Sequence, residues 1–182
     1  MIQQTQNNIS FGSKLAPTKT LKRVISDAYI GELASEDTAV LNKAIKSLIN
    51  DGKNDIIEIT EKTKGYTRFL ETSVNDTIKL SSKIFSPNYR EKSYQILRTL
   101  KVLAKERNPK LNFNELSTNE INALKPELKV LQDIVNEQKP TPDMFNIFDK
   151  ISDIRAIMDM KRHRTNLDDL HDLENKIFDK NI

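Results

Sequence analysis

Apolar residues at helical spacing cover most of the chain. The clearest case is residues 35–52, where apolar residues return every three or four positions and therefore lie on one helix face. These residues are Leu41, Ala44, Ile45, Leu48 and Ile49. Ser35 is predicted to cap this helix and Gly52 to end it. A shorter stripe of the same kind predicts a helix over residues 20–31.

Between residues 55 and 85 apolar and polar residues alternate instead. Three runs rich in Ile, Thr, Val and aromatic residues are separated by Lys64 with Gly65 and by Asn75 with Asp76, which are typical of turns. This pattern predicts a three-stranded antiparallel β-meander with one apolar face, which helices must cover. The apolar residues expected to share a side within their strands are Ile57 and Ile59, Leu70 and Val74, and Ile78, Leu80 and Ile84.

Helical spacing returns after residue 85. Ser86, Ser117 and Thr141 are each placed to cap a helix; Glu120 completes a capping box with Ser117, and proline directly follows Ser86 and Thr141. Pro126 is expected to begin or kink a second helical piece. A buried stripe is predicted at Ile96, Leu97, Leu100, Leu103 and Ala104. The second piece carries Leu128, Leu131, Ile134 and Val135, and a third helix carries Met144, Phe148, Ile151, Ile154 and Met158 on one face. With the meander, these helices predict a helix-rich α+β fold.

Both histidines lie in residues 160–174, between a basic and an acidic cluster. Cations stabilise the C-terminus of a helix and anions its N-terminus, so the reversal of charge predicts a joint between two helices, with Thr165 as the second cap. One continuous helix stays open as an alternative. A metal site would use Asp168, His171 and Asp172, which share a helix face. No further ligand set is visible, so neither a metal nor another cofactor is predicted.

Residues 1–16 are rich in Gln, Asn and Ser and have no apolar stripe. We therefore expect a flexible N-terminal arm that is dispensable for folding, with residues 17–182 forming a single α+β domain. Ile9 and Phe11 would share one side of an extended segment, so docking on a sheet edge or in a groove stays open. A targeting segment also stays open, because no acidic residue precedes Asp27.

The composition narrows the class of protein. The 182 residues are 37% hydrophobic and 30% charged, which suits one folded domain. Without cysteine there is no disulfide or thiol nucleophile, and the four glycines cannot form a phosphate loop or a dinucleotide fingerprint. No apolar run is long enough for a membrane span. We expect a soluble cytoplasmic protein, and an enzyme is less favoured than a binding protein.

The strongest local charge pattern lies on the helix predicted over residues 90–107. At 100° per residue, four basic side chains and one tyrosine fall within an arc of about 80°. These five residues, here called the basic strip, are Arg90, Tyr94, Arg98, Lys101 and Lys105. Such a strip suits an acidic protein partner or a phosphate backbone. The net charge of +3 is too small to add further support for nucleic acid.

These observations favour a small non-enzymatic intracellular interaction or structural protein with an unknown protein partner. The first alternative is a nucleic-acid-binding protein that uses the basic strip. The second is a hydrolase or transferase whose acidic, lysine or tyrosine side chains act without a recognisable motif. The partner, the oligomeric state and the biological process do not follow from the sequence.

Overall fold

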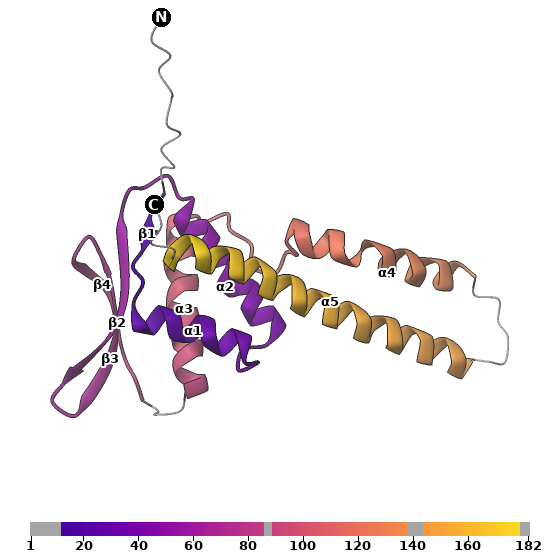
Figure 1. Cartoon of the computed structure of the whole chain (residues 1–182), viewed down its shortest axis with the longest axis horizontal. Coiled ribbons are helices and arrows are strands. Elements are labelled where there is room, and N and C mark those ends of the chain that lie inside the picture. Colours follow the sequence, from indigo (N-terminus) through magenta and orange to yellow (C-terminus); the bar gives the residue numbers. More distant parts are fainter. Residues whose placement is uncertain (1–11, 86–88, 138–143, 179–182) are drawn as a thin grey trace, which may run out of the picture.

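The computed structural model describes residues 12–85, 89–137 and 144–178, which form five helices and one sheet of four strands. The helices are α1 (Lys19–Tyr29), α2 (Ser35–Ile49), α3 (Tyr89–Arg107), α4 (Thr118–Asn136) and α5 (Met144–Phe178), and the strands are β1 (Lys14–Leu15), β2 (Ile56–Lys64), β3 (Thr67–Val74) and β4 (Thr77–Lys83). Figure 1 shows α1, α2 and α3 beside the sheet, while α4 and the first half of α5 project away as a pair. We call this pair, residues 118–137 and 144–160, the hairpin. The predicted α+β class is confirmed.

The sheet contains the predicted meander and one further strand. Its order is β1-β2-β3-β4; the pairs β2–β3 and β3–β4 are antiparallel, and β1 is parallel to β2. Asn75 and Asp76 have positive φ angles of 48° and 63°, as a tight turn between twisted strands requires. The sheet is therefore mixed, and β1 and β4 form its two edges.

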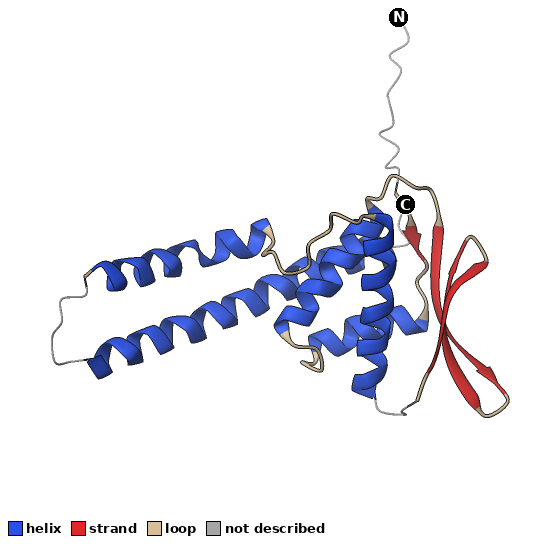
Figure 2. Ribbon diagram, turned by 180° about the vertical axis from the view of Figure 1, so that it is seen from behind, coloured by secondary structure: helices blue, strands red, loops and turns tan. Residues whose placement is uncertain are grey.

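One face of this sheet packs against helices, and no described helix covers the other (Figure 2). The predicted apolar stripes of α1, α2 and α3 are buried there, together with the last turns of α5. The largest fully buried apolar side chains are Leu21, Ile25, Leu33, Leu41, Ile45, Leu48, Ile57, Ile59, Ile96, Leu100 and Leu170. Burial of this shared core is the main term that holds sheet and helices together.

A β-bulge changes one predicted face. Thr72 lies opposite Leu80 and Ser73 lies opposite Ile78, so an extra residue enters β4 between them. Ile78 consequently points away from the side that carries Leu80 and Ile84, and it is 55% exposed. The prediction that these three residues share one side is wrong for Ile78, because a bulge shifts the period-2 alternation by one residue.

The predicted helix caps are present in part. The capping box is present, because Ser117 and Glu120 bond each other's backbone N–H groups. Ser35 is already the first residue of α2, and Ala34 precedes it without a side-chain cap, so the predicted cap at Ser35 is wrong. Pro126 lies inside the continuous helix α4. The caps predicted at Ser86 and Thr141, with their prolines, lie outside the described residues.

Residues 160–174 belong to one uninterrupted helix, α5, so the predicted joint at Thr165 is wrong. The charged clusters bind side chains of other elements instead of helix ends. Arg162 contacts Glu120 of α4 at 2.8 Å and Glu36 of α2 at 3.6 Å, and Asp169 accepts a hydrogen bond from Asn119. The change of charge along the sequence marks the place where α5 crosses from α4 onto α2.

The predicted arm ends earlier than expected, because residues 12–16 are part of the fold. Leu15 is 5% exposed in β1, and the Ser13 backbone and hydroxyl both donate to the Asp51 carboxylate. A Cβ atom on Gly12 would lie 1.7 Å from the backbone oxygen of Ile49, so only glycine fits there. A strand is thus added at the sheet edge just after Ile9 and Phe11, which themselves lie outside the described residues.

Deleting residues 1–16 is expected to lower the free energy of unfolding by about 3 kcal/mol or more. Burial of Leu15 contributes about 1.5 to 3 kcal/mol, and each hydrogen bond of Ser13 adds about 1 kcal/mol. The matched control, deletion of residues 1–11, leaves every described contact in place. Urea unfolding of both variants checks this. Agreement of the two within about 0.5 kcal/mol would show that β1 is dispensable.

Candidate functional site: a groove between β4 and α3

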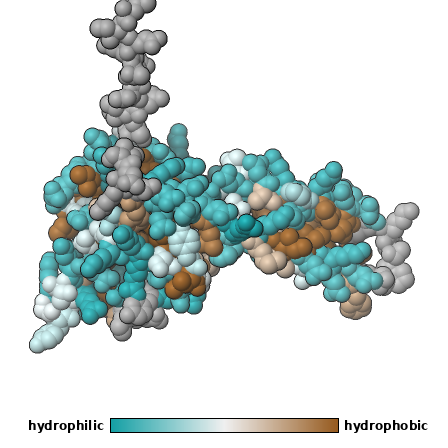
Figure 3. Space-filling model, in the orientation of Figure 1, coloured by the Kyte–Doolittle hydropathy of each residue, from teal (hydrophilic) through white to brown (hydrophobic). Residues whose placement is uncertain are grey.

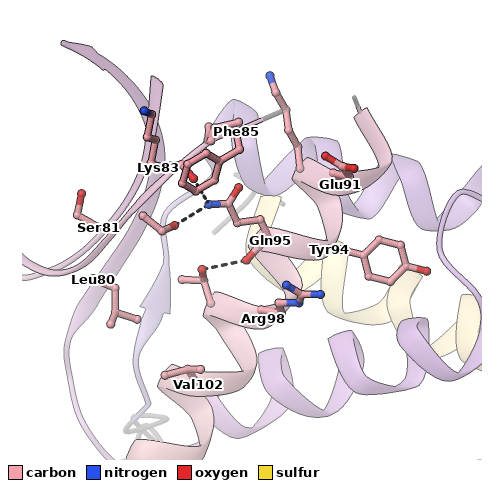
Figure 4. A pocket seen from close by; sticks show the side chains of 13 residues that line it. Leu80, Ser81, Lys83, Phe85, Glu91, Tyr94, Gln95, Arg98 and Val102 are labelled. Carbon is pink, nitrogen blue, oxygen red and sulfur yellow. Dashed lines mark hydrogen bonds between the residues drawn. The ribbon is translucent and has the colours of Figure 1, made fainter. Parts of the chain in front are cut away.

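A groove of about 700 Å³ between β4 and α3 includes residues of the basic strip. One wall is the strand end, with residues 80–85, and the other is one side of α3 from Glu91 to Val102. Gln95 bridges the walls, because its side-chain amide donates to the Ser82 hydroxyl at 2.7 Å and to the Lys83 carbonyl at 3.1 Å (Figure 4). The groove therefore lies at an edge where the sheet and its covering helices meet.

The backbone of β4 has an open edge at this groove. Backbone groups alternate in direction along a strand. The Ile84 N–H donates to the Arg68 carbonyl of β3 at 2.9 Å, so the groups of Ser81 and Lys83 point to the other side. The hydrogen bond from Gln95 to the Lys83 carbonyl agrees with this direction. No described strand pairs with this edge, which leaves a template for an added strand.

Apolar side chains lie toward both ends of the groove. Figure 4 shows Phe85 near Glu91 at one end, and Leu80 and Val102 at the other. Phe85 is 86% exposed and Val102 is 52% exposed, while Leu80 is half-buried. Exposed apolar groups of this size in one groove are typical of a surface that binds another molecule.

The charge of the groove is weakly positive. Lys92 is buried and pairs with Glu61 at 3.3 Å, so its charge is compensated from β2. Lys83 lies over the Phe85 ring at 5.4 Å. Arg98 is exposed and forms no ion pair or hydrogen bond with a described residue. Glu91 is the acidic residue among the lining side chains. The groove thus suits a ligand with a negative charge near Arg98.

The basic strip lies on one side of α3, but its members have different neighbours. The Arg90 guanidinium lies 5.9 Å from the centre of the Tyr94 ring, and the Tyr94 hydroxyl donates to Asp37 of α2 at 2.9 Å. The other two lysines contact the segment after α3: Lys101 lies over the Phe113 ring, and Lys105 donates to the Leu111 carbonyl. Of the strip, Tyr94 and Arg98 line the groove.

Sequence reasoning missed the strand wall of this site and part of the helix wall. Leu80, Ile84, Phe85, Gln95 and Val102 line the groove but were expected only as parts of elements, or were not singled out. A weak signal was present, because two serines in β4 leave room beside the strand. Which helix lies beside the edge strand depends on packing between different elements, so the sequence pattern does not reveal it.

Asp168, His171 and Asp172, the alternative metal ligands, lie exposed on α5. Within the described ranges, no group of three or more acidic or histidine side chains is arranged to hold a metal ion. In the same ranges, no helix is both long and apolar enough to cross a membrane.

Glu120 holds α4 against α5 at the end of the hairpin nearest the core. Its side chain is 1% exposed, accepts the Ser117 backbone N–H at 2.7 Å and accepts Arg162 Nε at 2.8 Å. Burial by itself raises the pKa of the Glu120 carboxyl, but the hydrogen bonds from Ser117 and Arg162 outweigh burial and hold that pKa below its usual range. The ionised carboxylate ties α4 to α5 at neutral pH.

The groove and the hairpin are two surfaces of this fold that carry exposed apolar groups beside charged ones. Comparison with known proteins finds no matching family model, no matching curated protein and no matching solved structure.

Proposed function

We propose that this chain is a non-enzymatic interaction protein that binds an extended, acidic segment of a partner protein in the groove between β4 and α3. The observation that carries the proposal is the open edge of β4 beside a lined groove. A peptide strand that pairs with a sheet edge gains main-chain hydrogen bonds, and pockets beside the edge select its alternate side chains.

The geometry assigns a role to each wall. The N–H and C=O of Ser81 and the N–H of Lys83 are the groups that a bound strand would use. Every second side chain of that strand would face α3, about 7 Å apart along the strand. Apolar side chains suit Phe85 at one end and Val102 at the other, and an acidic side chain suits Arg98 between them.

The contacts of Tyr94 favour a protein partner over nucleic acid. Base stacking needs an accessible ring face, and Arg90 lies over the Tyr94 ring while Asp37 holds its hydroxyl. The groove lining includes neither a histidine nor a pair of carboxylates, which weakens the hydrolase or transferase alternative. A cytoplasmic location would give this site access to acidic segments of intracellular proteins.

Panning a random library of displayed peptides on the full chain is expected to enrich sequences that combine an acidic residue with apolar ones. Ser81→Pro should weaken binding of a selected peptide at least about tenfold, because proline removes the N–H at the open edge. Arg98→Glu should do the same by reversing the charge. Fluorescence polarisation with the labelled peptide measures both.

Lys62→Glu is the matched control, since Lys62 is exposed on β2, away from the groove. It changes the net charge as Arg98→Glu does and should leave the affinity within about twofold. Equal loss in both charge variants would show nonspecific attraction. Unchanged binding by Ser81→Pro, or a panning that enriches no such peptide, would overturn strand addition. Salt-sensitive binding of a single-stranded oligonucleotide that Arg98→Glu abolishes would favour the nucleic-acid alternative.

A further inference from the structure

The hairpin exposes apolar side chains that the fold itself does not cover. Figure 3 shows hydrophobic residues gathered along it on the viewed face. Half of the sixteen large hydrophobic residues that are exposed in the described ranges lie on the hairpin. They are Ile121, Leu128, Val130, Val135, Phe145, Phe148, Ile157 and Met160. A projecting pair of helices with this much exposed apolar surface suits a further helical partner.

The spacing on α4 shows two apolar seams in place of one. The seam toward α5 includes Leu124, Leu131 and Ile134, which are buried or half-buried. Ile121, Leu128 and Val135 follow each other at intervals of seven, and they are 41%, 45% and 58% exposed. With Leu124 and Leu131 they form a second row at alternating intervals of three and four. A stripe this wide is typical of a helix that packs on two sides within a bundle.

The exposed apolar row of α4 continues onto α5, on the same side of the hairpin. Ile121, Leu128 and Val135 each directly follow a position of the seam toward α5, and Phe148 likewise follows Ile147. In two antiparallel helices, residues that follow the seam lie on the same side of the pair. We call these four residues, Ile121, Leu128, Val135 and Phe148, the outer stripe. It extends about 21 Å along α4, at 1.5 Å per residue.

Two charges of α5 beside the outer stripe are self-complementary. Arg155 occupies the next position of this side on α5, one heptad after Phe148, and Asp159 lies one turn further. Both are exposed, and neither forms an ion pair with a described residue. A two-fold axis between them would place Arg155 of each copy opposite Asp159 of the other. A cation and an anion one turn apart therefore favour a second copy of this chain over an unrelated helix.

We propose that the outer stripe is a self-association surface, through which two copies pack their hairpins into a four-helix bundle. The apolar residues then become core positions, and Arg155 and Asp159 align the copies. Sedimentation equilibrium of the full chain, from micromolar to near-millimolar concentration, should show a monomer–dimer equilibrium. A protein that remains monomeric over this range overturns the proposal.

Two hairpin variants test whether dimerisation depends on the outer stripe or on any exposed apolar residue of the hairpin. Leu128→Glu places a charge in the stripe and should abolish the dimer. Val130→Glu is the matched control, because Val130 lies on the other side of α4 with a similar exposure, 47% against 45%. It should leave the dimerisation constant within about twofold. Equal effects of both variants contradict the assignment to this face. Circular dichroism and thermal unfolding confirm that each variant remains folded.

A charge exchange tests whether the occupant is a second copy. Arg155→Asp and Asp159→Arg should each weaken dimerisation at least about tenfold, because like charges then face each other across the axis. The double variant restores opposite charges at both contacts and should recover the parent constant. Failure of the double variant to recover, or single variants that dimerise normally, overturns the pairing of Arg155 with Asp159 across the axis.

Discussion

Replacing Arg107 with Met is expected to lower the free energy of unfolding by about 3 to 5 kcal/mol, because it leaves a buried carboxylate without its partner. The Arg107 side chain is 7% exposed at the end of α3, and the Asp51 side chain that it contacts is 3% exposed. Arg107 also contacts Asp55 at 2.9 Å and donates to the Ser13 hydroxyl at 2.7 Å. One guanidinium thus joins α3, the segment after α2 and the residue before β1.

The effect of Arg107→Met should depend on pH. Burial by itself raises the pKa of Asp51, but hydrogen bonds from Ser13, Lys53 and Arg107 outweigh burial and hold that pKa below its usual range. A carboxyl whose pKa is lowered by folding contributes stability above its unfolded pKa, and this contribution is lost as the pH falls through the folded value. The difference between parent and variant should therefore be full at neutral pH and shrink below about pH 4.

Urea unfolding at neutral and acidic pH measures both effects. Arg98→Met, on an exposed arginine of the same helix that forms no ion pair with a described residue, is the control and should change stability by no more than about 0.5 kcal/mol. Combining Arg107→Met with Asp51→Asn removes both charges, so the double variant should be less destabilised than the sum of the single changes. A loss of less than about 1 kcal/mol in Arg107→Met would show that the ion cluster does not anchor β1.

Replacing Thr165 with Pro is expected to cost about 3 kcal/mol or more, because residue 165 lies in the interior of α5. Proline there removes a backbone hydrogen bond and its ring clashes with the preceding turn. The expected damage is large for a second reason. Asn166 is buried and donates to the Ser35 carbonyl at 3.0 Å, so a bend at residue 165 would displace the crossing of α5 over α2.

Thr165→Ala distinguishes a continuous helix from the helix joint that the sequence predicts. In a continuous helix alanine is an acceptable replacement and should change stability by less than about 1 kcal/mol. At a joint, Thr165→Ala would remove a cap and cost about 0.5 to 2 kcal/mol, whereas proline at the boundary would be tolerated. The continuous helix and the joint predict opposite orders of stability for the alanine and proline variants, and denaturant unfolding measures that order. A proline variant more stable than the alanine variant would contradict the continuous helix.

The groove shows how much of a candidate site the sequence predicts. Helical spacing placed Tyr94 and Arg98 on one side of α3, and the structure keeps them there. The strand wall was predicted as the third strand of a meander, which has one neighbour and therefore lies at an edge of the sheet, as β4 does. The position of α3 beside that edge was not predicted, because it depends on packing between segments that no local pattern of residues records. The proposed use of the groove therefore rests on tertiary structure.

The sequence by itself determined the local elements of this protein. The stripes of α1, α2 and α3, the meander turn at Asn75 and Asp76, and the capping box at Ser117 all depend on residues a few positions apart. Signals of this kind act through helix and strand periodicity and through backbone preferences, which short segments already possess. The α+β class follows from them, because helices and an apolar sheet face must cover each other.

The tertiary structure decided that β1 joins the sheet and that α5 is one continuous helix. Strand β1 forms because Leu15 pairs with β2 and because Asp51 and Arg107 bind Ser13 directly before it, although the segment has no strand pattern of its own. The charges around Thr165 resemble two helix ends, yet α5 continues through them because residues of α2 and α4 pair with them from the side. Contacts between distant segments outweigh local preference wherever they bury polar groups with their partners satisfied, and those contacts exist only once the chain has folded.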